Sequence, residues 1–81
     1  MELSKQDIKS IYSLVESSMN IKLSDKGRKA LKGDIVRRMG IAQGNKDMLF
    51  EYFKDYDGEL RKIYSAWDSY DRIAWVYNLT K

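Results

Sequence analysis

Apolar residues recur in the first part of the chain with the spacing of an amphipathic helix. They fall every three or four positions, at Ile8, Ile11, Tyr12, Val15 and Met19. This spacing places the side chains on one face of an α-helix. Ser4 is a good N-cap, and Asp7, three residues later, is suited to complete a capping box. The pattern predicts a helix over residues 4–19 that stops at Asn20.

A second apolar stripe predicts a helix over residues 25–39, capped by Ser24 or Asp25. The stripe is formed by Leu31, Ile35 and Met39, with Ala30 and Val36 close to it. Gly40 is a natural C-terminal stop. Two internal glycines each weaken this helix by about 1 kcal/mol relative to alanine.

The next apolar set predicts a long helix over residues 46–67, capped by Asn45. Its members are Leu49, Phe53, Tyr56, Leu60, Ile63 and Trp67, which alternate steps of four and three. The apolar phase continues across Gly58, which favours one helix. Gly58 is the position at which this helix would kink. The alternative is a break within "DYDGE", residues 55–59, which has the composition of a turn.

A final helix is predicted over residues 69–79, capped by Asp68 or Ser69. Its apolar residues are Tyr70, Ile73, Ala74, Val76 and Tyr77. No segment shows the period-2 alternation of a half-buried strand. The sequence therefore predicts an all-α fold, a compact bundle of about four helices in a single domain over residues 1–81.

The composition removes most enzyme classes. The 81 residues contain neither His nor Cys. This excludes a Ser–His–Asp or Cys–His arrangement, a disulfide and a thiolate metal site. "GIAQGNK" has the wrong spacing for a phosphate-binding loop, and "DYDGE" lacks the twelfth-position Glu of a calcium loop. We therefore expect a protein that is not an enzyme and binds no metal or cofactor.

The chain has no feature of a secreted or membrane protein. It begins with the polar "MELSKQDIKS", which is not a signal peptide. Its longest apolar run, "IAWVY", is far too short to cross a membrane. We expect a cytoplasmic protein without a membrane association.

Positive charge is concentrated in the first part of the chain. Residues 1–46 carry ten Lys/Arg and five Asp/Glu, a net of +5, whereas residues 47–81 carry a net of −2. On a helical wheel, Lys26, Lys29 and Arg37 lie opposite the apolar stripe with Gly33 between them. Lys32 and Arg38 flank the stripe, where long basic side chains can extend to solvent.

Three interpretations of this basic helix remain open. It is solvated or paired internally, it docks on a protein, or it binds nucleic-acid phosphates. Internal pairing has a candidate partner, because Asp47, Glu51, Asp55 and Glu59 recur every four residues and form an acidic stripe.

Aromatic residues are concentrated in the last 30 positions. Most are expected in the core, but Tyr64 and Trp75 lie off the main apolar lines. Exposed Tyr and Trp are favoured interface anchors, so both are candidate partner-binding residues. The regular spacing over residues 46–67 also suits a homodimer seam.

The first half of the chain resembles the N-terminal helical domain of CheR-type chemoreceptor methyltransferases. An amphipathic helix, an Ile21-x-Leu23 turn and a basic helix ending in an Arg-Arg pair before Gly carry the resemblance, with "FEYF" following. It covers about residues 7–53. In that family the basic helix is implicated in docking onto an acidic helical protein. The resemblance therefore implies a docking role for Lys29, Lys32, Arg37 and Arg38. The methyltransferase domain has no counterpart here, so no cofactor site is implied.

These patterns favour a small binding protein that docks on a larger protein with an acidic surface and inhibits or modulates it, as an inhibitor or adaptor does. Small proteins encoded by phages and mobile elements often act in this way, so such an origin is an expectation for this chain. The expected contact residues are Lys26, Lys29, Lys32, Arg37, Arg38, Tyr64 and Trp75. The alternative is a DNA- or RNA-binding regulator acting through the same basic helix.

Overall fold

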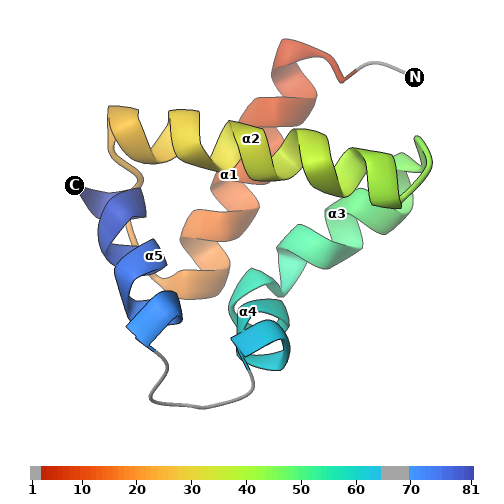
Figure 1. Ribbon diagram of the computed structural model, residues 1–81. Helices are drawn as coiled ribbons and strands as arrows, with labels where there is room; N and C mark the ends of the chain where they lie inside the picture. Colours follow the sequence, from red (N-terminus) through yellow and green to blue (C-terminus); the bar gives the residue numbers. More distant parts are fainter. Residues whose placement is uncertain (1–2, 65–69) are drawn as a thin grey trace.

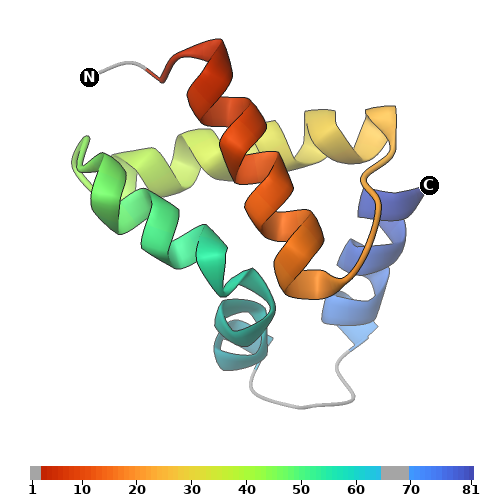
Figure 2. The same cartoon turned by 180° about the vertical axis from the view of Figure 1, so that it is seen from behind.

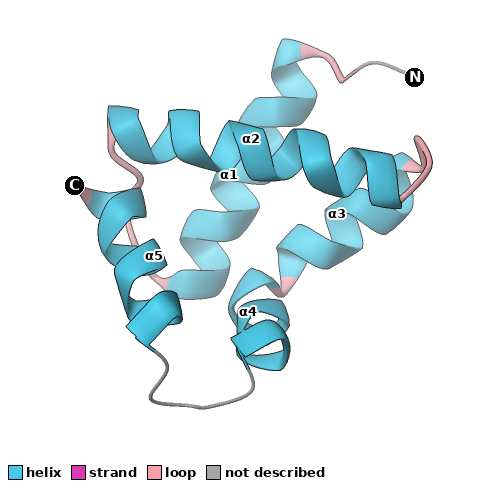
Figure 3. Ribbon diagram, viewed as in Figure 1, coloured by secondary structure: helices cyan, strands magenta, loops and turns pink. Residues whose placement is uncertain are grey.

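The protein is helical throughout the part of the chain that the structure describes. The structure, a computed structural model, describes residues 3–64 and 70–81. Within them the chain forms five α-helices and no strand (Figures 1 and 3). These are α1 (Lys5–Met19), α2 (Asp25–Ile41), α3 (Lys46–Lys54), α4 (Tyr56–Tyr64) and α5 (Tyr70–Thr80). The all-α prediction is confirmed, but the chain forms five helices rather than four.

The extra helix arises because the predicted 46–67 helix is broken at Asp55. That residue has φ −122° and ψ 51°, outside the helical region. The new helix direction is held by α1, since the Asp57 amide donates to Ser18 Oγ at 3.1 Å. The alternative prediction, a break within "DYDGE", is confirmed. Residues 65–67 of the predicted helix lie outside the described residues.

The caps at the helix starts were predicted well, whereas the end of α2 was not. Ser4, Ser24 and Asn45 each accept a backbone hydrogen bond from the third helical residue. Helix α2 continues through Gly40 to Ile41, so the predicted stop at Gly40 is wrong. The left-handed residues that turn the chain are Gln43 and Gly44.

All five helices contribute to one buried core. The predicted stripes supply Ile11, Val15, Leu31, Ile35, Leu49, Phe53, Tyr56 and Leu60, and Leu23, Tyr52 and Leu79 complete the core. Four of the residues proposed as a homodimer seam are thus buried inside the chain, at Leu49, Phe53, Tyr56 and Leu60. That part of the apolar stripe is unavailable to a second copy.

Helix α5 packs through a different face from the predicted one. Tyr70, Ile73 and Tyr77 are exposed, while Leu79 is buried and Trp75 packs partly against the core. The prediction followed the spacing of the apolar residues along the helix, but the contact of α5 with α2 decides which face is buried. The predicted cap at Asp68 or Ser69 lies outside the described residues.

Helices α1 and α2 cross, and the later helices pack around them. Figure 1 shows α2 across the front and α1 behind it, and the reverse view in Figure 2 shows α1 in front. Helix α5 stands beside the first turn of α2, while α3 and α4 lead away from the other end. None of the described helices has the length and apolar character that a membrane crossing needs.

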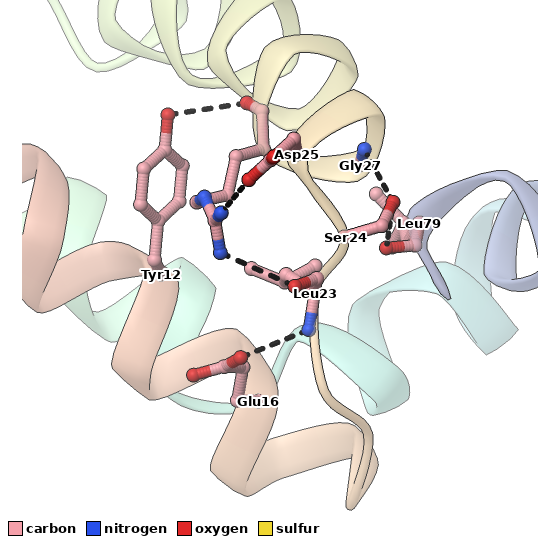
Figure 4. A network of polar contacts seen from close by, with 8 residues as sticks. Tyr12, Glu16, Leu23, Ser24, Asp25, Gly27 and Leu79 are labelled. Atoms are coloured by element: carbon pink, nitrogen blue, oxygen red, sulfur yellow. Dashed lines mark hydrogen bonds and ion pairs between the residues drawn. The ribbon is translucent and has the colours of Figure 1, made fainter. Parts of the chain in front are cut away.

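The turn from α1 into α2 is fixed by polar contacts (Figure 4). The Leu23 amide donates to Glu16 Oε2 at 2.9 Å, and the Tyr12 hydroxyl donates to the Arg28 carbonyl at 3.1 Å. The Ser24 amide donates to the Leu79 carbonyl of α5 at 2.9 Å. These bonds set the direction in which α2 leaves the turn.

Two carboxylates make the fold sensitive to acid. Burial alone raises the pKa of Asp57, but hydrogen bonds from Arg72 and Arg61 outweigh it, so the pKa lies below its usual value. A hydrogen bond from Lys46, then one from the Ser4 backbone, lowers the pKa of Asp7. A carboxyl whose folded pKa is depressed contributes stability above its unfolded pKa and loses it as the pH falls through the folded pKa.

We therefore expect the urea midpoint to hold from neutral pH to about pH 5 and to fall below about pH 4. Urea titrations followed by circular dichroism measure this profile. Asp57→Asn should flatten the acid side of the profile. Glu51→Gln, an exposed change on α3, should leave it unaltered. A wild-type midpoint that rises on acidification contradicts the assignment.

Candidate protein-docking site

The outer face of α2 is the side of the helix turned away from Leu31 and Ile35. It consists of the exposed residues Lys26, Lys29, Lys32, Gly33, Val36, Arg37, Gly40 and Ile41. Figure 1 looks onto the helix that carries it. Four of the predicted contact residues, three lysines and one arginine, therefore lie on one continuous surface.

The outer face is strongly basic. Helix α2 contains six Lys/Arg and two Asp, a net of +4. Both aspartates pair within the helix, Asp25 with Arg28 and Asp34 with Arg37. Lys26, Lys29 and Lys32 form no ion pair with any side chain of the described residues. The N-terminal half of the face thus presents three ammonium groups to solvent.

The acidic stripe does not neutralise this charge by direct pairing. Asp47, Glu51 and Asp55 are exposed on and after α3. Glu59 pairs with Lys62 of its own helix at 3.3 Å. Across residues 3–64 and 70–81, no ion pair joins the stripe to α2. The interpretation in which this stripe pairs with the basic helix therefore has no support in the geometry.

The C-terminal half of the outer face combines exposed aliphatic side chains and bare glycine backbone with Arg37. Val36 is 65% exposed and Ile41 is 60% exposed. A Cβ at Gly33 or Gly40 would meet no atom within 4 Å. Val36 lines a groove with Ile35 and Met39 of the predicted stripe, but it is rotated about 100° from Ile35 around the helix, so its side chain is exposed rather than buried. Bare backbone beside exposed apolar side chains allows a partner to approach closely.

A cleft lies beside the outer face, between α2, α4 and α5, and we call it the α2–α4–α5 cleft. Its volume is about 480 Å³. Arg37, Arg38 and Ile41 line it from α2, and Leu60 and Ile63 line it from α4. Asp34 of α2, which pairs with Arg37, and Tyr52, Tyr56 and Trp75 complete the lining. The structure therefore brings Arg37, Arg38 and Trp75, predicted separately, to one site.

A hydrogen-bonded chain ties the walls of this cleft together. The Tyr56 hydroxyl donates to Asp34 Oδ2 at 2.7 Å and accepts a hydrogen bond from Trp75 Nε1 at 2.9 Å. Burial raises the pKa of Tyr56, and the bond to Asp34 raises it further. The hydroxyl therefore stays protonated at neutral pH and holds α2, α4 and α5 in a fixed relation.

Trp75 and Arg38 are less exposed than the sequence suggested. Trp75 is half-buried and packs partly against the core. Arg38 is half-buried too, and its guanidinium lies 3.7 Å from the centre of the Tyr52 ring. Both contribute to the cleft rather than to the outer face. The side chain of Tyr64 lies outside the described residues.

Comparison with known proteins adds no assignment. No family model, curated protein or solved structure matches the chain. The resemblance to the CheR-type helical domain stays a prediction, and the site rests on its own geometry.

Sequence reasoning missed the tertiary parts of the site. Asp34 and Tyr56 are 22 positions apart, and no local pattern signals their contact. The sequence predicts a loop at Ile41, because Gly40 indicates the end of the helix. Among the described residues, no three acidic side chains cluster closely enough to hold a metal ion.

Proposed function

We propose that this chain is a non-enzymatic binding protein that docks on a larger protein through the outer face of α2. The observation that carries the proposal is the composition of that face. Lysines occupy its N-terminal half, and Val36 and Ile41 are exposed in its C-terminal half. A partner that covers this face has carboxylates opposite the lysines and apolar side chains opposite Val36.

The mixture of charge and apolar surface distinguishes a protein from a nucleic acid. Phosphate backbones satisfy ammonium and guanidinium groups but offer little to aliphatic side chains. Protein interfaces combine an apolar centre with a charged rim. By occupying a surface, a bound domain of this kind blocks another partner or shifts its target between states.

Charge reversal on the outer face tests the proposal. Lys26→Glu with Lys29→Glu should weaken the binding of an acidic partner at least about tenfold. Lys26 lies in the first turn of α2, where acidic residues are favoured, and both lysines are exposed, so the variant should keep its fold. The matched control is Lys9→Glu with Lys54→Glu. Both control lysines line a groove between α1 and α3, so the same change in charge is made away from α2.

The measurement uses immobilised wild type and both variants to capture proteins from cell lysate. A candidate is a protein lost with the α2 variant and retained with the control, and it is then titrated in purified form by calorimetry. Equal retention by both variants, or equal affinity in calorimetry, contradicts docking through this face.

The second candidate function is nucleic-acid binding through the same face. It is favoured by the placement of Lys26, Lys29 and Arg37 around the exposed Gly33. Fluorescence anisotropy with labelled DNA and RNA duplexes separates the two functions. Affinity that falls by orders of magnitude between about 50 and 200 mM salt indicates several phosphate contacts. That result, abolished by the α2 variant, replaces the protein partner with a nucleic acid.

A further inference from the structure

The α2–α4–α5 cleft has aliphatic side chains at its edge that the fold leaves open. Ile41 is 60% exposed and Ile63 is 58% exposed. Both line the same cleft, together with buried Leu60. Burying such side chains against a partner removes apolar surface from water, which favours binding. The edge formed by Ile41 and Ile63 therefore favours an apolar side chain as its occupant.

The cleft is already formed, so little ordering is required on binding. Tyr56 joins Asp34 of α2 to Trp75 of α5 through its hydroxyl. Tyr52 and Tyr56 pack edge-on, with ring centres 5.8 Å apart. Preformed walls reduce the entropy lost when an anchor side chain is immobilised.

The positive charge at the edge of the cleft favours an occupant that carries negative charge. The Arg37 side chain is 76% exposed. Among the described residues, it donates a side-chain hydrogen bond to Asp34 alone. Arg38 stacks on the Tyr52 ring and forms no ion pair within the described part of the chain. A guanidinium stacked on a ring keeps the edge of its fork available for a carboxylate.

We propose that this cleft receives one large apolar side chain of an acidic amphipathic helix from the partner protein. A carboxylate within one turn of that anchor binds Arg38 or Arg37. This inference rests on the proposed function and adds to it the chemistry of the partner's contact segment. A groove between helices suits a helical ligand, whose anchors recur every three or four residues.

Selection from a display library of helical peptides, each about 16 residues long, tests the cleft without a known partner. Peptides enriched on the wild-type protein should carry a large apolar residue with Asp or Glu within one turn. Their affinity should fall at least about tenfold on Ile63→Glu, which places a charge in the apolar edge and repels the carboxylate. Arg38→Gln should also weaken them, with a smaller salt dependence than wild type.

Met48→Glu is the matched control, because Met48 is also 58% exposed and does not line the cleft. It should leave peptide affinity within about twofold. Enriched peptides should also shift the indole N–H signal of Trp75 in ¹H–¹⁵N spectra. Failure to enrich, enrichment without acidic residues, or binding that Ile63→Glu leaves intact overturns the inference.

The two proposals fail separately. A captured partner that is lost with Lys26→Glu and Lys29→Glu but retained by Ile63→Glu overturns the cleft and leaves docking through the outer face. Acidic peptides that require Ile63, together with a partner insensitive to the lysine changes, support the cleft and overturn the role of the outer face.

Discussion

Gly27→Ala should destabilise the protein by about 3 kcal/mol or more, a large part of the stability of a domain this small. A Cβ at Gly27 would lie 1.9 Å from the Leu79 carbonyl oxygen. That oxygen belongs to the backbone of α5 and accepts the Ser24 amide. Relief of the clash therefore requires α2 and α5 to separate. Urea unfolding followed by circular dichroism measures the loss.

Gly33→Ala is the matched control for this change. It lies in the same helix, with no atom within 4 Å of the added Cβ. Because alanine is more favourable than glycine in a helix interior, the control should gain up to about 1 kcal/mol of unfolding free energy. Equal unfolding free energies for the two variants contradict the close approach of α2 and α5. A Gly27→Ala protein that fails to fold agrees with it.

Phe53→Ala should cost about 3–5 kcal/mol, because it empties the centre of the core. Phe53 is fully buried, and its ring centre lies 5.0 Å from that of Tyr52 and 5.1 Å from that of Tyr56. Phe50 lies on the same helix but is only partly buried. Phe50→Ala should therefore cost clearly less. Equilibrium unfolding in urea compares the two.

A milder substitution keeps this test informative if Phe53→Ala does not fold. Phe53→Leu conserves most of the volume and should cost no more than about 1.5 kcal/mol. The expected order of stability is wild type, Phe53→Leu, then Phe53→Ala. Similar losses of unfolding free energy for Phe50→Ala and Phe53→Ala would contradict the full burial of Phe53 in the core.

Local signals explain which parts of the fold could be predicted. The caps at Ser4, Ser24 and Asn45 depend on residues three positions away, and the sequence displays them directly. The break at Asp55 was the second choice, because the apolar phase continues across it. Its cause includes a hydrogen bond from Asp57 to Ser18, 39 positions away, which no local pattern reveals.

The same distinction applies to the candidate site. The basic face of α2 follows from its helical wheel, and Lys26, Lys29 and Arg37 lie where the wheel places them. The cleft depends on the packing of α5 against α2. The apolar spacing favours Tyr77 as a buried residue, whereas Leu79 is buried and Trp75 lines the cleft, so the side of α5 facing the cleft could not be predicted from local spacing.

The bond between Ser24 and Leu79 joins positions 55 residues apart, and it has a consequence for the order of folding. Helix α2 gains its packing against α5 only when that helix arrives, whereas α1 packs on α2, α3 and α4. During synthesis from the N-terminus, the contact of α2 with the last turn of α5 therefore forms only after Leu79 has been made. Closing so long a loop costs entropy before this contact compensates for it. We expect the contact of α2 with α5 to be among the last that the folding chain acquires.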